Sequence, residues 1–146
     1  AIRRQRQMCI RDSDMEGGQT NEFRPLILVA EDDDSNFKLI KAIIGKKCDI
    51  QWAKNGEEIV ALFKEYGKEA KAILMDIKMP VMNGLDATKI IREENKEIPI
   101  IMQTAYAFSS DKENAMNAGA SEVLVKPITL SILRGTLTKY FPELVW

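Results

Sequence analysis

The sequence of 146 residues contains no histidine. This absence excludes Ser-His-Asp and Cys-His catalysis, zinc sites with histidine ligands, and histidine phosphotransfer within the chain itself. The two cysteines, Cys9 and Cys48, lie far apart and form no Cys-x-x-Cys pair, which argues against a disulfide framework and favours a reducing compartment. With 21 basic and 22 acidic residues, the net charge of -1 offers no general attraction to nucleic acid or to an acidic membrane.

The remaining composition is that of a globular domain. Hydrophobic residues make up 45% of the chain and charged residues 29%. No apolar run approaches the roughly 20 residues of a membrane span, and the length fits one domain at about 100–200 residues per domain. Residues 1–24 hold five arginines and a Gly-Gly pair without an apolar period. We expect them to be a leader or linker, disordered or in part non-native, outside a folded domain of residues 25–146.

Strand-like and helix-like segments alternate from Pro25 onward. Five segments have the apolar character of strands: residues 26–30, 49–53, 72–75, 98–104 and 122–125. Five segments show the spacing or end signals of helices: residues 36–46, 57–66, 83–94, 110–119 and 129–140. In the fourth of these, Ser110 and Glu113 predict a capping box and Gly119 the helix end. Five βα units predict an α/β fold with a parallel sheet covered on both faces.

Polar residues follow the predicted strands, at the edge where such sheets bind ligands. Glu31 and Asp32 follow the first strand and Asp76 the third, while Thr104 ends the fourth and Lys126 follows the fifth. Three carboxylates and one ammonium sum to -2, which one divalent cation would bring to zero. Because every expected ligand is a hard oxygen, magnesium or manganese is favoured over zinc or copper.

This set of residues suits phosphoryl transfer. Asp76 beside a metal can attack phosphorus and form an acyl phosphate. Lys126 would neutralise charge on the phosphoryl group, and Thr104 would donate a hydrogen bond to it. The chain has no G-x-x-x-x-G-K-[ST] loop to hold a nucleotide triphosphate. The donor is therefore a small phosphoryl compound or another protein, and a phosphohistidine donor must lie on a partner.

Four segments, in this order and at these intervals, resemble the receiver domain of two-component response regulators: LILVAEDDDSN, ILMDIKMPVMNGLDA, IIMQTA and VLVKPI. The resemblance implies a doubly wound, flavodoxin-like (βα)5 fold with strand order 2-1-3-4-5. It also implies a Mg²⁺-dependent phosphoacceptor of a phosphorelay, rather than an enzyme acting on other molecules. Asp76 would accept the phosphoryl group, with Thr104 and Lys126 as its catalytic partners. The implied Mg²⁺ ligands are Glu31, Asp32, Asp76 and the main-chain carbonyl of Lys78.

The segments EDDDSN and MPVMNGLDATKIIR are similar to receivers fused to hybrid sensor histidine kinases. The resemblance therefore implies a parent chain of that kind and a histidine kinase or histidine phosphotransfer domain as the partner. It implies a cytoplasmic location, free or tethered to a membrane-bound sensor kinase. It further implies a cis peptide bond between Lys126 and Pro127, and a loop after the third strand shaped by Pro80 and Gly84.

Val123 departs from the family pattern. It lies three residues before Lys126, where the family usually has Tyr or Phe whose ring moves inward with the threonine. We therefore expect phosphorylation to change the last two helices only modestly. Tyr106 and Phe108 are the nearby aromatic residues that could take over this role.

Three other functions compete on this fold. A phosphatase with an aspartyl intermediate would use a DxD pair after the first strand; Asp32 and Asp34 have this spacing but leave Asp76 unexplained. A flavodoxin-like redox protein would need a loop rich in Ser, Thr and Gly where this chain is acidic. A pseudo-receiver would bind partners without phosphorylation, although the complete set of site residues argues against it.

Overall fold

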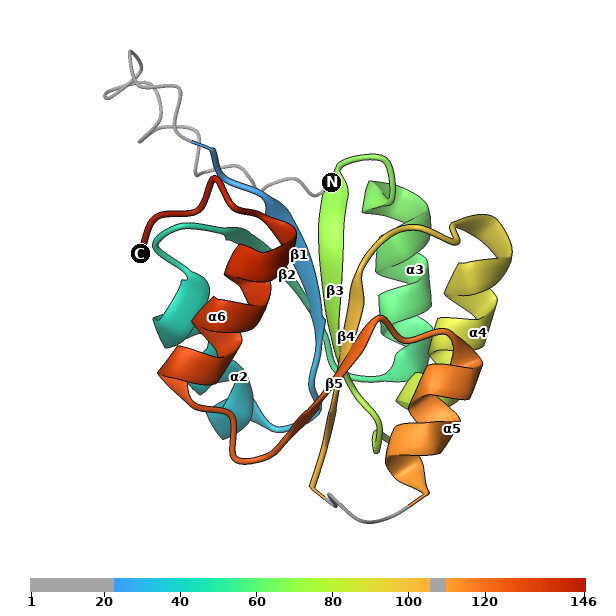
Figure 1. Cartoon of the computed structure of the whole chain (residues 1–146). Helices are drawn as coiled ribbons and strands as arrows, with labels where there is room; N and C mark the ends of the chain where they lie inside the picture. The colour runs from blue at the N-terminus through green and yellow to red at the C-terminus, as the bar shows by residue number, and fades with distance from the viewer. Residues whose placement is uncertain (1–22, 106–109) are drawn as a thin grey trace.

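The computed structural model describes residues 23–105 and 110–146. Its elements, in chain order, are β1 (Leu26–Ala30), α2 (Asp34–Ile44), β2 (Asp49–Ala53), α3 (Gly56–Tyr66), β3 (Ala70–Asp76), α4 (Gly84–Glu94), β4 (Ile100–Thr104), α5 (Asp111–Ala118), β5 (Glu122–Val125) and α6 (Leu130–Tyr140). The strands form one parallel sheet in the order β2-β1-β3-β4-β5, which confirms the expected fold class. Helices α2 and α6 cover one face, and α3, α4 and α5 cover the other (Figure 1).

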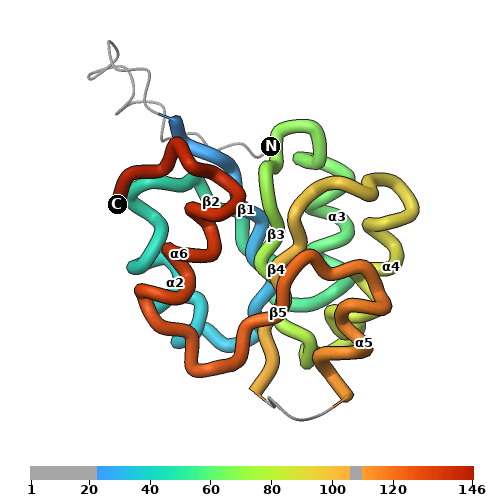
Figure 2. Tube along the Cα trace, viewed as in Figure 1, coloured from blue at the N-terminus to red at the C-terminus, as the bar shows by residue number. Residues whose placement is uncertain are grey.

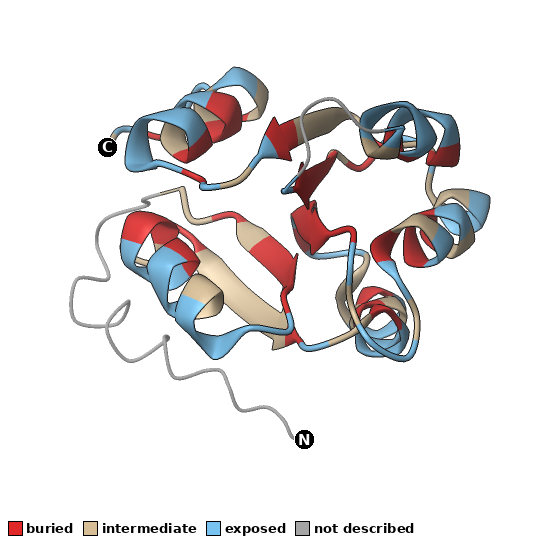
Figure 3. Ribbon diagram, turned by 90° about the horizontal axis from the view of Figure 1, so that it is seen from below, coloured by how far each residue is buried: buried red, intermediate tan, exposed pale blue. Residues whose placement is uncertain are grey.

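β1 and residues 72–75 of β3 are apolar throughout because successive side chains point to opposite faces of the sheet, both of which are buried. In β1, Ile27 and Val29 pack in the cluster under α2 and α6, whereas Leu28 packs under α3, α4 and α5. In β3, Leu74 and Met75 divide between the two clusters in the same way. Burying one such side chain stabilises the fold by about 1.5–3 kcal/mol. Figure 3 shows the buried strands between helices whose outer faces are exposed.

Four helices begin at a side-chain cap. Asp33 Oδ1 accepts a hydrogen bond from Ser35 N at 2.9 Å, at the start of α2. Asn55, Asn83 and Thr129 cap α3, α4 and α6 in the same way. Because each cap satisfies an N–H group that the helix leaves unpaired, it fixes where the chain turns from a strand end into the first helical turn.

Helix α5 begins differently, and the predicted capping box is wrong. Ser110 has φ -68° and ψ -4°, and its side chain makes no capping hydrogen bond. A capping box requires an extended backbone at the cap, so that the hydroxyl reaches the N–H of a residue such as Glu113. The predicted end of the helix is confirmed: Gly119 has a left-handed φ of 116°, and its N–H points to the carbonyls of Ala115 and Met116.

Element boundaries differ from the sequence-based expectation by about two residues. Strand β3 begins at Ala70 rather than at residue 72, and β4 begins at Ile100 rather than at residue 98. Pro99 has no N–H to donate to a strand ladder, although its carbonyl accepts from Ile73 N at 2.9 Å. Helix α2 covers residues 34–44 rather than 36–46, because Asp33 caps it two residues earlier.

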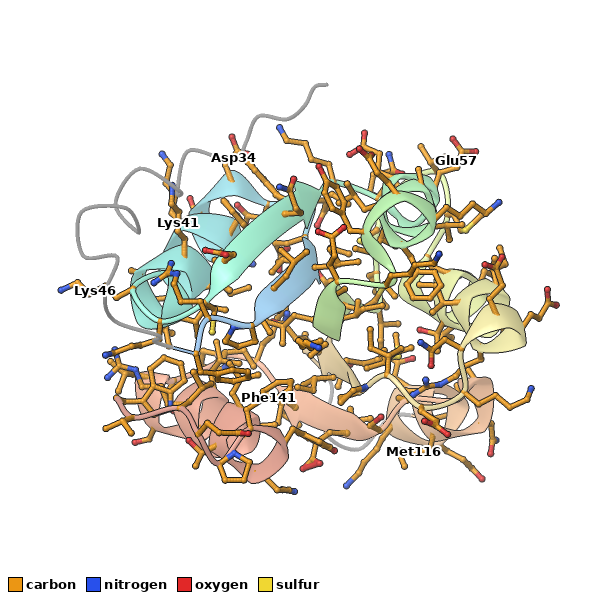
Figure 4. All side chains as sticks on the ribbon, turned by 90° about the horizontal axis from the view of Figure 1, so that it is seen from above. Asp34, Lys41, Lys46, Glu57, Met116 and Phe141 are labelled. Carbon is orange, nitrogen blue, oxygen red and sulfur yellow. The ribbon has the colours of Figure 1, made fainter. Side chains whose placement is uncertain are left out.

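The two ends of the sheet differ in character. The carboxyl ends of the strands lie together at the lower end of Figure 1, and the C-terminus lies toward the opposite end (Figure 2). Viewed from that opposite end (Figure 4), Phe141 follows α6 into the cluster under α2 and α6, with its ring 6.1 Å from that of Phe23.

None of the helices in residues 23–105 and 110–146 combines the length and apolar character needed to cross a bilayer.

Candidate functional site

A cavity of about 290 Å³ opens at the carboxyl end of the sheet. All six residues that the sequence predicts as site residues line it: Glu31, Asp32, Asp76, Lys78, Thr104 and Lys126. They end or follow the four strands β1, β3, β4 and β5, and they meet because parallel strands present their carboxyl ends at the same edge. Their placement is as expected, whereas their chemical roles are inferences that follow from the geometry.

Asp76 and Lys126 form a close charged pair in the cavity. Asp76 is the last residue of β3 and is only 6% exposed. Lys126 Nζ donates to its Oδ2 at 2.9 Å. Burial lowers the pKa of Lys126, but the hydrogen bond and charge of Asp76, together with the charges of Glu31 and Asp32, outweigh burial and raise the pKa overall. The ammonium therefore stays charged beside the carboxylate. The peptide bond between Lys126 and Pro127 is cis, as the resemblance implies.

Three carboxylates gather on the other side of Asp76. Oxygens of Glu31, Asp32 and Asp76 all lie within 4.8 Å of one another. Glu31 is fully buried; its Oε2 accepts from Asp33 N at 3.3 Å, while its Oε1 accepts no hydrogen bond within the described part of the chain. Burial, followed by the charge of Asp76, raises the pKa of Glu31 to about 7 against the opposing charge of Lys126.

Lys126 Nζ lies 3.8 Å from Glu31 Oε1, but one ammonium cannot balance three neighbouring carboxylates, and such a buried group is costly unless a further cation neutralises it. The donor set consists of hard oxygens, and Asp32 is exposed, so part of the site is open to water. Mg²⁺ prefers oxygen ligands and retains several of its waters. The residues of the cavity therefore fit a magnesium ion.

The loop after β3 packs tightly against the phosphoacceptor candidate. Gly84 N donates to the carbonyl of Ile77 at 2.8 Å, and a Cβ at Gly84 would collide with the carbonyl oxygen of Asp76. Met82 N donates to the carbonyl of Pro80 at 2.7 Å, across Val81. Val81 has a left-handed φ of 68°, which a β-branched residue rarely adopts. The loop thus depends on a residue without a side chain at position 84.

Thr104 ends β4 and is 3% exposed. Its hydroxyl donates to Asp111 Oδ2 at 3.3 Å, in the first turn of α5. The main-chain carbonyl of Thr104 accepts from Lys126 N at 2.7 Å, so β4 and β5 position both residues together. Val123, in β5, is partly buried and packs against the cluster under α3, α4 and α5. Tyr106 and Phe108 lie outside the described residues.

Two contacts of the site were not predicted from the sequence. Asp111 reads as an ordinary acidic residue at a helix N-terminus, which the helix dipole alone explains. Trp52 reads as a structural residue of the second strand, yet its indole Nε1 donates to the main-chain carbonyl of Glu31 at 2.8 Å. Both contacts join residues from different elements, so no local spacing in the sequence indicates them.

Comparison with known sequences shows the family to which the chain belongs. The sequence model of the response regulator receiver domain matches residues 27–138. The chain is 41% identical over 129 residues to hybrid signal transduction histidine kinase I of Dictyostelium discoideum, covering 80% of this chain and 7% of that protein. It is 30% identical over 120 residues to the polar-differentiation response regulator DivK of Brucella anthropi, covering 80% of this chain and 96% of that protein. The chain therefore spans a small fraction of the hybrid kinases that it matches, and nearly all of a free-standing regulator.

Solved structures agree. The receiver domain of a sensor histidine kinase from Pseudomonas aeruginosa, with magnesium coordinated in its active-site cleft, superposes with a TM-score of 0.75 at 30% identity, covering 82% of this chain and 99% of that one. The receiver domain of a Saccharomyces cerevisiae response regulator, in complex with a histidine phosphotransfer protein, gives a TM-score of 0.75 at 28% identity, covering 84% and 93%. The chain thus belongs to the response regulator receiver domain family, the phosphoacceptor module of two-component phosphorelays.

Proposed function

We propose that Asp76 is the residue that accepts the phosphoryl group, from a phosphohistidine on a partner protein and with the help of Mg²⁺. The observation that carries this proposal is the position of its carboxylate. One oxygen is 2.9 Å from the Lys126 ammonium, and the group lies within 4.8 Å of both Glu31 and Asp32. This arrangement combines a nucleophile, a fixed cation and a cation-binding oxygen set around one point.

In the proposed step, a carboxylate oxygen of Asp76 attacks phosphorus. The new P–O bond forms as the P–N bond to the donor imidazole breaks, and the leaving imidazole takes up one proton and departs neutral. Lys126 neutralises part of the charge on the phosphoryl oxygens, and the Thr104 hydroxyl donates to one of them after leaving Asp111. A bound Mg²⁺ supplies positive charge that offsets the carboxylates and the transferred oxygens.

Glu31, Asp32, Asp76 and the carbonyl of Lys78 would hold the magnesium ion. Glu31 Oε1 accepts no hydrogen bond within the described residues and has the Lys126 ammonium at 3.8 Å, and this together with the short distances among the three carboxylates supports the assignment. The position of Lys78 in the wall of the same cavity supports the fourth ligand.

The partner would be a histidine kinase or a histidine phosphotransfer domain, because this chain contains no histidine of its own. The similarity to hybrid kinases supports a receiver of that class, and the yeast complex supports a phosphotransfer protein as a docking partner. The proposed chemistry requires no turnover on other molecules, so the domain would act as a phosphoacceptor that catalyses its own modification. Its charge balance gives no reason to expect nucleic acid or membrane binding.

The phosphatase alternative is weaker on geometric grounds. It would need Asp32 and Asp34 to act together after β1. Asp34 instead belongs to the first turn of α2 and forms an ion pair with Lys54 at 3.4 Å. Asp34 also does not line the cavity.

The test uses phosphoramidate, the simplest donor with a P–N bond, followed by electrophoresis in a phosphate-binding gel. Wild-type protein with Mg²⁺ should shift to a slower band that hydroxylamine removes, since hydroxylamine cleaves acyl phosphates. Asp76→Asn should not shift, whereas Asp86→Asn, which alters an exposed aspartate of α4, should behave as wild type. A shifted band in Asp76→Asn, or a shift unaffected by EDTA, would contradict the proposal.

A further inference from the structure

Trp52 binds the main chain that carries the acidic pair. Its Nε1 donates to the carbonyl oxygen of Glu31 at 2.8 Å, and the N–H of Glu31 donates to the carbonyl of Ala53 at 2.9 Å. Both main-chain polar groups of Glu31 are thus held by adjacent residues of β2.

The Trp52 indole donates the hydrogen bond to the Glu31 carbonyl, which lies beyond the last residue pair of the β1–β2 ladder. The β1–β2 ladder ends at the pair of Ala30 and Ala53, after which the chain turns away toward the cap of α3 at Asn55. The carbonyl of Glu31 lies beyond that last pair, and a main-chain carbonyl at this depth needs a donor. Because the peptide unit is planar, fixing this carbonyl also fixes the direction in which the chain enters Asp32.

The Trp52 ring is itself held in place. The ring of Phe37, in α2, stacks on it with centroids 3.9 Å apart and planes 2° from parallel. Lys54 Nζ lies 4.9 Å from the ring centroid and also pairs with Asp34 at 3.4 Å. Trp52 therefore contacts Glu31, in the turn at residues 31–33, and Phe37 in the helix that follows this turn.

We propose that Trp52 is a positioning residue for the magnesium site, acting through the Glu31 carbonyl to hold Glu31 and Asp32 in their binding geometry. This inference rests on the proposed function, because it assumes that these two carboxylates bind Mg²⁺. Partners that orient metal ligands commonly change metal affinity by about 10–100-fold when removed. We expect Trp52→Phe, which keeps an aromatic ring for Phe37 but loses the N–H, to weaken Mg²⁺ binding about tenfold.

The experiment is calorimetric titration of each protein with MgCl₂, beside urea unfolding of the metal-free forms. Trp146→Phe is the matched control, because Trp146 Nε1 also donates to a single oxygen, Thr138 Oγ1 at 2.9 Å, on α6. A purely structural role would lower stability in both variants and leave both Mg²⁺ affinities unchanged. The inference expects an affinity loss in Trp52→Phe alone.

Asp32→Ala separates the two possible failures. If it loses binding while Trp52→Phe binds as wild type, the positioning role is wrong and the proposed metal site stands. If it binds as well as wild type, the proposed metal site is wrong and the inference falls with it. If Trp52→Phe does not fold, the tryptophan fluorescence of Trp146→Phe, which retains only Trp52, provides the test. This fluorescence should change during Mg²⁺ titration with the Kd measured by calorimetry. Constant fluorescence would overturn the inference.

Discussion

Glu31 should make the metal-free protein less stable as the pH rises toward neutrality. The carboxyl is fully buried beside Asp76, and burial together with that charge raises its pKa from 4.5 to about 7. The folded state thus holds the Glu31 proton more tightly than the unfolded state does. This contribution to stability is fully present below about pH 4.5 and is lost as the pH rises through about 7.

The pKa difference sets the size of the effect. A shift from 4.5 to about 7 corresponds to roughly 3 kcal/mol. We therefore expect the free energy of unfolding of the metal-free wild type to fall by up to roughly 3 kcal/mol between about pH 5 and 8. Lys126 does not contribute in this window, because its pKa is raised from 10.5 and its effect lies at higher pH. Glu31→Gln, which cannot titrate, should lose most of this fall.

Urea unfolding followed by circular dichroism in EDTA measures this directly. Near pH 8 Glu31→Gln should be more stable than wild type. Mg²⁺ at 1,000 times the wild-type Kd should reverse the order, since it stabilises the binding-competent protein by about 4.1 kcal/mol. Glu65→Gln, which removes an exposed carboxylate on α3, should keep the wild-type pH dependence. A wild-type stability that is flat over this range, or an equal slope in Glu31→Gln, would show that Glu31 does not hold its proton more tightly in the folded state.

Three further predictions concern the loop after β3 and the output of the domain. Gly84→Ala should lower the free energy of unfolding by about 1–3 kcal/mol, because the added Cβ would collide with the carbonyl oxygen of Asp76. Gly135→Ala, on α6, should raise it by about 0.5–1 kcal/mol, because the added Cβ meets no atom there. Equal effects of the two variants in chemical denaturation would contradict this prediction. Val81→Asn should raise the free energy of unfolding by about 1 kcal/mol, because Val81 has a φ of 68° and is 74% exposed, so strain is relieved and little packing is lost; a less stable variant would argue against strain. Because Val123 has no ring to move, beryllofluoride should shift amide resonances mainly in the loops after β3 and β4; large shifts throughout α5 and α6 would show that another residue has taken over the aromatic role.

The sheet and its site were predictable because each depends on a simple rule. A strand buried on both faces is mostly apolar, which predicts residues 26–30 as a strand, and the alternation of strands with helices predicts a parallel sheet. The meeting of Asp76 and Lys126, 50 residues apart, then follows from the shared carboxyl edge of parallel strands.

What was missed depends on contacts between elements. The hydroxyl of Ser110 would cap α5 only from an extended backbone, and its sequence position does not determine that conformation. The bond from Trp52 to Glu31 requires the exact register of β1 against β2, and the stacking of Phe37 requires the packing of α2 on the sheet. Neither requirement leaves a pattern in the local sequence.

The proposed function requires that Asp76 alone carries the phosphoryl group. Intact mass after treatment with acetyl phosphate and Mg²⁺, followed by peptide mapping, tests it most directly. The wild type should gain the mass of one phosphoryl group on the peptide that contains Asp76, and Asp76→Asn should gain none. A phosphoryl adduct retained in Asp76→Asn, or mapped to another carboxylate, would show that Asp76 is not the phosphoacceptor.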